Sequence, residues 1–397
     1  MSKELIFAFI EENKEEFISL SRKIWENPEL GHKEFKACKW LTNELKKHNF
    51  EVELGTGGLE TGFRGVYDSK LPGPTVAYLC EYDALPEIGH ACGHNLIGVM
   101  SLAAGISLSK VIKETGGKVI VFGTPAEETS GAKVTYAEQG LFDTVDVALM
   151  AHPSQNHERS GTSKAMDAIQ FDFYGKSAHA ASHPEDGVNA LDAVIQTFTN
   201  INALRQQTTD DARIHGIISH GGVAPNIIVD RAQAQFYVRT KQMETLVPLV
   251  ERVINCAKGA ALATGCRLEV SRHEFSYANL ITNETLSNVY NDNLIKLGVI
   301  EEEIKTGLKH GSNDMGNVSH KVPSIHPYIK VPNAPYPVHT TEFREAAGSE
   351  DGMKTLILGA KTLAATGYDI LTKKELLEKI KEEFETTRGN EPFQAIL

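Results

Sequence analysis

The sequence has few cysteines, no strongly basic segment and no long apolar run. Its 5 cysteines are odd in number and widely spaced along 397 residues, which excludes a disulfide framework and favours a reducing cytoplasm. No apolar run approaches the roughly 18 residues of a membrane-spanning helix. A net charge of −12 without a basic cluster argues against nucleic acid and anionic membrane surfaces as partners.

Several common catalytic motifs are also missing. The sequence has no Gly-x-Ser-x-Gly elbow, no His-Glu-x-x-His helix and no Walker phosphate loop. The glycines within residues 55–58 miss the dinucleotide-binding spacing and indicate a turn. The N-terminus leads straight into an amphipathic acidic segment, unlike a secretory signal, which again favours the cytoplasm.

What remains is the composition of an ordinary globular protein. Hydrophobic residues make up 41% and charged residues 23% of the chain, and its length is sufficient for more than one domain. Helical apolar spacing covers residues 3–48, with an interruption at Asn27-Pro28 and a second helix over 34–47 whose charged face is expected to be solvated.

Beyond these helices the pattern changes to short, continuous apolar runs. Such runs are typical of strands buried on both faces. They cover residues 75–80, 119–122 and 146–151, and a buried helix is expected over 96–112. Alternating strands and helices imply an α/β domain with a mostly parallel sheet and right-handed crossovers.

Reactive side chains follow each of these three strands. Cys92 and His94 lie in a loop of small residues after the first strand. Glu127 and Glu128 follow the second strand, and His152 follows the third. Taken singly, each has an ordinary structural explanation. Because ligands of open parallel sheets bind beyond the carboxyl ends of the strands, we expect these side chains to share one crevice.

A thiolate, imidazoles and carboxylates together suit a borderline-soft divalent metal. If Cys92 bridges two ions, His94 and His152 would complete the coordination of one ion. Glu128 and the more distant His339 would complete the other. Each ion then has three protein ligands and open positions for water and substrate, which is the arrangement of a catalytic site.

Two acidic side chains beside these ligands have predicted roles of their own. Glu127 adjoins a ligand without being needed as one, so it is the natural general base and acid. Asp83 would hold His94 in orientation, as metal-bound imidazoles usually require. The chemistry that this arrangement favours is hydrolysis of an amide bond.

Two other functions remain open. Cys92 could be the nucleophile of a metal-free amidase with a histidine base, but His94 is too near in sequence to be sure of facing the thiol. That reaction would also leave Glu127, Glu128 and His152 without a role. The fold could instead bind a small molecule without catalysis. A metal count tests the first alternative, and an activity screen before and after chelation tests the second.

A second domain is expected from about residue 165. Apolar and polar residues alternate over 169–174, which predicts a half-exposed strand. There follow a helix over 187–206, strands over 214–218 and 233–240, a helix over 245–264 and a strand over 267–275. The order β-α-β-β-α-β is a complete ferredoxin-like unit. We therefore predict a catalytic domain in two parts, 1–165 and 280–397, with an inserted domain at 166–279.

These features resemble a known family. Over essentially its whole length the chain is similar to the di-metal amidohydrolase and metallopeptidase superfamily of aminoacylases, succinyl-diaminopimelate desuccinylases and glutamate carboxypeptidases. Cys92-Gly93-His94 resembles the branch that contains hippurate, auxin-conjugate and aminobenzoyl-glutamate hydrolases. The resemblance implies a bridging Cys92, a base at Glu127, and metal ligands at His94, Glu128, His152 and His339.

The resemblance extends to the inserted domain, which in this family is a lid and dimerisation domain. Ser177-Ala178-His179-Ala180 resembles the segment whose histidine reaches the partner subunit's active site and stabilises the oxyanion. Asn226 and Arg239 resemble the pair that grips the substrate carboxylate, for which the arginine fork is suited. A homodimer is therefore implied.

The resemblance also implies the cofactor and the substrate class. Each chain would hold two divalent ions, with zinc expected and manganese or cobalt as alternatives. The substrate would be an N-acyl amino acid or a small dipeptide-like amide with a free carboxylate.

The sequence departs from the family pattern in two places. The usual His-x-Asp after the first strand is replaced by Glu81-Tyr82-Asp83, so His94 would substitute for the missing histidine. Hippurate and auxin-conjugate hydrolases carry Asp and His where Asn95 and Ile97 stand here. With the segment 311–318, these departures resemble the aminobenzoyl-glutamate hydrolases and the β-alanyl-lysine-type dipeptidases.

Overall fold

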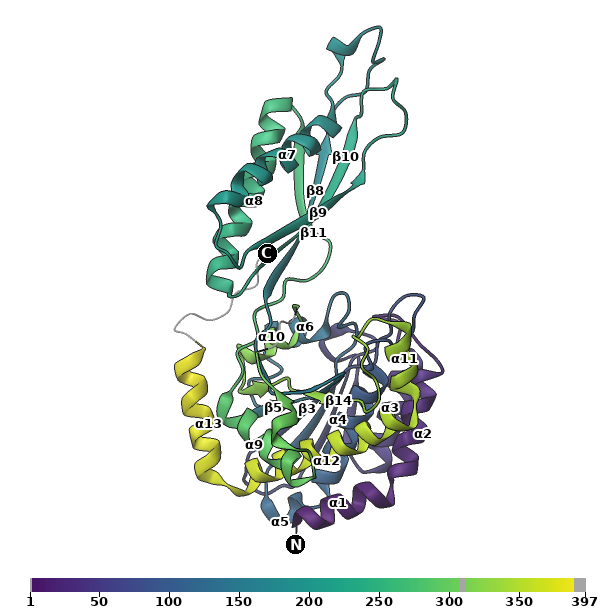
Figure 1. Cartoon of the computed structure of the whole chain (residues 1–397), viewed down its shortest axis with the longest axis vertical. Coiled ribbons are helices and arrows are strands. Elements are labelled where there is room, and N and C mark those ends of the chain that lie inside the picture. The colour runs from purple at the N-terminus through teal and green to yellow at the C-terminus, as the bar shows by residue number, and fades with distance from the viewer. Residues whose placement is uncertain (1, 308–310, 389–397) are drawn as a thin grey trace. The chain divides into compact units, whose positions relative to one another are not determined.

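The computed structural model describes residues 2–307 and 311–388, which form two compact units. The first unit contains residues 2–162, 280–307 and 314–388. The second contains residues 163–279 and 311–313. Figure 1 shows both units.

A six-stranded sheet forms the centre of the first unit. Across the sheet the strands are β1 (Glu51–Leu54), β2 (Phe63–Asp68), β4 (Lys118–Gly123), β3 (Thr75–Cys80), β5 (Val147–Leu149) and β13 (Ser324–Ile325). β3 is parallel to β4 and β5, and β13 is parallel to β5. The predicted mostly parallel α/β fold is confirmed. The antiparallel edge formed by β2 and β1 was not predicted.

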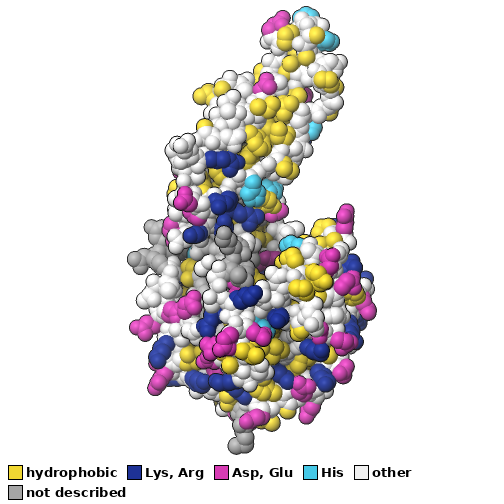
Figure 2. Space-filling view, in the orientation of Figure 1, with side chains coloured by type: hydrophobic (Ala, Val, Ile, Leu, Met, Phe, Trp, Pro, Cys, Tyr) yellow, Lys and Arg dark blue, Asp and Glu magenta, His cyan; other side chains and the backbone are white. Residues whose placement is uncertain are grey.

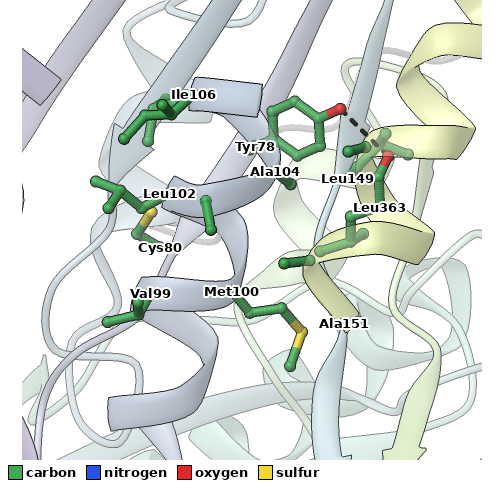
Figure 3. Packing of buried hydrophobic residues seen from close by; sticks show 14 of the residues in the cluster. Tyr78, Cys80, Val99, Met100, Leu102, Ala104, Ile106, Leu149, Ala151 and Leu363 are labelled. Carbon is green, nitrogen blue, oxygen red and sulfur yellow. Dashed lines mark hydrogen bonds between the residues drawn. The ribbon is translucent and has the colours of Figure 1, made fainter. Parts of the chain in front are cut away.

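Helices bury both faces of this sheet. They are α1 (Ser2–Glu12), α2 (Lys14–Trp25), α3 (Phe35–Lys47), α4 (His94–Ser109), α5 (Ile112–Thr115), α6 (Ala132–Glu138), α9 (Glu284–Lys296), α10 (Met315–Ser319), α11 (Thr341–Gly348), α12 (Glu350–Thr372) and α13 (Lys374–Thr387). Every residue of α4 is buried, as a helix apolar on all sides requires. In Figure 3, Tyr78 of β3 donates its hydroxyl to the carbonyl of Leu363 in α12, at 3.2 Å.

The first unit also contains a small four-stranded sheet. Its order is β12 (Ile304–Lys305), β7 (His157–Glu158), β14 (Tyr328–Lys330) and β6 (His152–Ser154). β14 runs parallel to β6, and the backbone N–H of His152 donates to the carbonyl of Pro327. His152 is therefore the first residue of a strand and is not in a free loop.

The second unit has the predicted β-α-β-β-α-β order. Its elements are β8 (Ala165–Tyr174), α7 (Ala190–Leu204), β9 (Arg213–His220), β10 (Arg231–Thr240), α8 (Met243–Thr264) and β11 (Arg267–Arg272). The sheet order is β11-β8-β10-β9 and every pairing is antiparallel. Figure 1 shows α7 and α8 together on one face of this sheet.

Two local predictions were wrong. The first helical run is broken at Asn13 as well as near Pro28, which separates α1 from α2. The strand over 169–174 is mostly buried, although alternation predicted a half-exposed strand. It belongs to β8, a central strand, and its polar Asp172 is buried because Gln233, Gln170 and Arg231 donate to its carboxylate. Among the described helices, none is long and apolar enough to cross a membrane.

The contact between α4 and α12 predicts the effect of a core truncation. Leu363 is completely buried in it, so Leu363→Ala should lower the free energy of unfolding by about 2–5 kcal/mol. Leu5→Ala in α1, where 55% of the side chain is exposed, is the control and should change it by less than about 0.5 kcal/mol. Urea denaturation of both variants measures the difference, and equal midpoints would contradict this packing.

Candidate metal centre

Four segments of the first unit bring the predicted metal-binding side chains together. Cys92 and His94 stand at the start of α4, Glu128 follows β4, His152 begins β6 and His339 precedes α11. Their donor atoms form two groups that could each hold an ion, with all atoms of a group within 4.8 Å of one another. One group is Cys92, His94 and His152, and the other is Cys92, Glu128 and His339. Cys92 is the member that these two groups share.

Individual distances support this arrangement. The Cys92 Sγ atom lies 3.4 Å from Nε2 of His152. Nε2 of His339 lies 3.1 Å from Oε1 of Glu128. The two carboxylates of Glu127 and Glu128 each have an oxygen 4.0 Å from Nε2 of His94. Glu127 is thus beside both groups, and it forms a further cluster with His94 and Glu128.

The backbone geometry requires a glycine at position 93, between Cys92 and His94. Gly93 has a φ of 79°, in the left-handed region, and it precedes the first residue of α4. A Cβ atom at this position would lie 2.6 Å from Cγ of Pro153, the residue after His152. Glycine therefore lets the chain turn into α4 while it passes close to the His152 strand.

Asp83 fixes the orientation of the His94 ring and the position of its Nδ1 proton. Nδ1 of His94 donates toward Oδ1 of Asp83 at 2.9 Å, and the Asp83 carbonyl lies 3.0 Å from the same nitrogen. The other carboxylate oxygen accepts the backbone N–H of Glu128 at 3.1 Å. Nε2 of His94 is left with no hydrogen-bond partner among the described residues. That nitrogen is the one available for a metal.

The turn before Glu127 is strained and is held by a carboxylate that was not predicted from the sequence. Ala126 has a φ of 65°, and its N–H donates to Oε1 of Glu34 at 2.9 Å. The other Glu34 oxygen accepts from the hydroxyl of Thr61 at 2.8 Å. Burial and the nearby Asp83 raise the pKa of Glu34 to about 7. The sequence predicts a solvated charged face for the helix over 34–47, but Glu34 is buried, and no local signal distinguishes it from the other charged residues.

The electrostatics of the cluster fit a metal. Burial and then the Glu128 carboxylate raise the pKa of the Cys92 thiol well above its ordinary value. Burial and the carboxylates of Glu128 and Glu81 do the same for the pKa of Glu127. Divalent cations would reverse both effects, because they stabilise the thiolate and the carboxylate. The thiol, imidazole and carboxylate donors are also those that zinc prefers.

The substrate-binding residues predicted in the second unit occupy two separate places. His179 is exposed, and its neighbour Ala180 donates its N–H to the carbonyl of Asn226 at 3.0 Å. Arg239 is near the other end of β10, where its guanidinium donates to Ser312 at 2.9 Å. β10 rises about 26 Å from Arg231 to Arg239, at roughly 3.3 Å per residue, and Asn226 lies before its start. Within one chain they do not lie together.

Comparison with known proteins identifies the family. Residues 162–264 match the family model described as a peptidase dimerisation domain. The Xaa-Arg dipeptidase of Mus musculus is 41% identical, over 94% of this chain and 90% of the relative. One of the subunits of the p-aminobenzoyl-glutamate hydrolase of Escherichia coli is 27% identical, over 97% and 95% respectively.

Solved structures agree on the fold. A dinuclear metal-binding peptidase of the M20 family from Bacillus subtilis superposes with a TM-score of 0.65 at 20% identity, covering 89% of this chain and 98% of that one. An aminobenzoyl-glutamate utilization protein from Klebsiella pneumoniae gives a TM-score of 0.72 at 18% identity, covering 90% and 96%. With the relationship to the mouse dipeptidase, these findings show that the chain belongs to the M20 peptidase family of amide-bond hydrolases.

Proposed function

We propose that this protein is a metal-dependent dipeptidase that hydrolyses a small dipeptide-like or N-acyl amino acid amide with a free carboxylate. The observation that carries the proposal is the pair of three-residue donor groups that share the Cys92 thiol, with Glu127 beside them. The similarity to an Xaa-Arg dipeptidase supports dipeptides with a C-terminal arginine as the first substrates to test.

Two divalent ions would be held in this centre, with zinc expected and manganese or cobalt as alternatives. When bound, such a pair polarises the amide carbonyl and activates a water molecule. His94 and His152 would hold one ion, Glu128 and His339 the other, and Cys92 both. Asp83 fixes the Nδ1 proton of His94 and so leaves Nε2 free to coordinate.

Glu127 would move the protons of the reaction. Its carboxylate would accept a proton from the attacking water and deliver it to the leaving amine. The strained turn at Ala126 and its hydrogen bond to Glu34 support this role, because they hold the backbone that aims Glu127. Glu34 is therefore a positioning residue in this proposal.

His179 would stabilise the oxyanion as a hydrogen-bond donor. Its Nδ1 accepts the backbone N–H groups of Ala181 and Ser182, at 3.3 and 3.2 Å. A neutral ring with Nδ1 accepting carries its proton on Nε2, and that N–H points away as a donor. This tautomer is the one that an oxyanion requires.

The distribution of polar groups along β10 supports a site completed by two chains. Because His179 and Asn226 lie together and Arg239 lies far from them, one substrate could contact all three only if they come from different chains. We propose that His179 acts on the partner's substrate and that Asn226 and Arg239 bind the substrate carboxylate from different chains. The second unit would then be a lid and dimerisation domain.

The surface of the second unit supports association of two copies. β9 is an edge strand, paired on one side by β10, and exposes 61% of Ile217 and 45% of Ile218. Figure 2 shows hydrophobic side chains gathered on this unit. Long apolar edge strands invite pairing with a second chain.

The metal-free cysteine amidase is the alternative function. Cys92 lies near His152, as a nucleophile would lie near its base. Burial opposes this chemistry, because it raises the pKa of the thiol and lowers the pKa of His152 to about 4. For Cys92 and His152, neutral groups are therefore favoured over the thiolate–imidazolium pair that the reaction needs. All 5 cysteines are free thiols, which suits our proposal of a cytoplasmic protein.

A substrate panel with controlled metal tests the function. We expect hydrolysis of dipeptides or N-acyl amino acids, loss of activity after chelation, and recovery with zinc, manganese or cobalt. Elemental analysis should find two ions per chain, and Cys92→Ala should lose most of both because one thiol serves two ions. Full activity after exhaustive chelation would favour the cysteine amidase, and no activity on any amide would favour a binding protein.

The two adjacent glutamates should give opposite phenotypes. Glu127→Gln keeps the shape but cannot accept a proton, so kcat should fall by at least about 10²–10⁴-fold while metal content stays normal. Glu128→Gln removes a ligand and should lower metal content. Steady-state kinetics with elemental analysis of both variants measures this contrast, and the reverse pattern would mean that the two roles are exchanged.

Mixing of two inactive variants tests the shared site. His179→Ala and Glu127→Gln chains should each be inactive alone. After subunit exchange, a mixed dimer has one site with an intact Glu127 and the partner's intact His179, so activity should return to about a quarter of wild type. Exchange is verified by mass spectrometry of tagged chains. If it occurs without recovery, His179 does not act across the dimer.

A further inference from the structure

Ser312 has no role in the function proposed above, although it contacts the arginine that is proposed to bind the substrate carboxylate. Its Oγ accepts a hydrogen bond from Nη1 of Arg239 at 2.9 Å. Ser312 belongs to the short segment 311–313, which is distant from Arg239 in sequence but lies in the same unit. The contact determines which part of the guanidinium stays available to a ligand.

The segment that carries Ser312 is anchored on both sides of this residue. Before it, the carbonyl of Gly311 accepts the backbone N–H of Lys164 at 2.9 Å. After it, the completely buried Asp314 accepts from Nζ of Lys133 at 2.7 Å and from the backbone N–H of Lys133 at 3.2 Å. These bonds hold the backbone on either side of Ser312, so its hydroxyl is a fixed acceptor.

Two uncharged groups hold the guanidinium of Arg239. It lies over the ring of Tyr237, with Cζ 5.2 Å from the ring centroid, and the stacking fixes its plane. The bond to Ser312 fixes its rotation within that plane. Among the described residues, this guanidinium makes no other hydrogen bond and no ion pair. Burial lowers the pKa of Arg239, and a bound carboxylate would offset this effect.

The bond to Ser312 leaves one edge of the guanidinium open. An arginine grips a carboxylate most firmly through two parallel N–H groups. Because Nη1 of Arg239 is used, the pair that remains is Nε and Nη2. The same unit shows this pair at work, since Arg272 donates from Nε at 3.1 Å and from Nη2 at 2.9 Å to the two oxygens of Asp167. The open edge of Arg239 is therefore one that binds a carboxylate elsewhere in this chain.

From this geometry we propose that Ser312 is a positioning residue, which holds Nη1 of Arg239 so that Nε and Nη2 bind the two oxygens of the substrate carboxylate. The inference rests on the proposed function and deepens it, because it assigns the group that orients carboxylate recognition. It also implies selection against a C-terminal carboxamide. A carboxamide has one acceptor oxygen and turns an N–H donor toward the second guanidinium N–H.

The alternative is that the bond between Arg239 and Ser312 only fastens the segment 311–313. Loss of a fastening would lower stability, or would weaken the action on free-acid and amide substrates by the same factor. Loss of a positioning residue would affect the free acid alone. Its effect would appear in KM and not in kcat, because the carboxylate is bound in the ground state and the transition state alike.

The test is steady-state kinetics of Ser312→Ala with the best dipeptide of the substrate panel, and inhibition by the C-terminal amide of the same dipeptide. We expect KM of the acid to rise about five- to tenfold, since a hydrogen bond to a charged group is lost, with kcat and the inhibition constant of the amide within about twofold of wild type. Ser312→Thr keeps the hydroxyl and should restore KM. Ser69→Ala is the matched control, because Ser69 is also half-buried and its hydroxyl donates to the carbonyl of Gly117 at 2.7 Å.

An unchanged KM in Ser312→Ala, or equal losses for the acid and the amide, would overturn the proposal. If that variant does not fold, a crystal structure of the wild-type protein with the product amino acid decides the question. A carboxylate on Nε and Nη2 of Arg239, with Ser312 still on Nη1, supports the proposal, and a carboxylate that displaces Ser312 from Nη1 overturns it. A wild-type protein that hydrolyses no dipeptide would instead refute the proposed function, so the two failures are distinguishable.

Discussion

The arrangement of the first unit depends on one electrostatic constraint, the burial of several acidic groups at one edge of its sheet. Glu81, Asp83, Glu127 and Glu128 each have an oxygen within 4.0 Å of a ring nitrogen of His94, and Lys133 pairs with Glu81. Buried carboxylates in such number are costly unless cations compensate them. The pair of metal ions that we propose would supply positive charge to this donor set.

The backbone is shaped to keep this cluster in place. Gly93 turns the chain into α4 through the left-handed region, and Ala126 and His339 adopt positive φ values of 65° and 67° without being glycine. Such conformations persist only where the surroundings enforce them. Glu34 accepts the N–H of Ala126, and the carbonyl of Ala91 accepts the N–H of His339. Strain is therefore concentrated at the turns that carry the proposed base and a proposed metal ligand.

In the second unit, strand β10 separates the predicted substrate-binding residues from one another. β10 places the Asn226 segment before its start and Arg239 near its end. A strand is stiff, so residues near or beyond its two ends cannot contact one small substrate within a single chain. This geometry supports the proposal that one substrate is contacted by residues of two chains.

The sequence by itself determined the strands β3, β4 and β5, the order of the second unit, and the residue types that gather at the strand ends. These follow from local periodicity and from the rule that parallel strands end at one edge. Only the tertiary structure decided that Glu34 supports Ala126 across 92 positions, that Lys133 and Asp314 meet across 181, and that β1 and β2 form an antiparallel edge. Periodicity reports how a residue is buried. The partner it meets there is chosen by packing between segments distant in sequence, which no local pattern records.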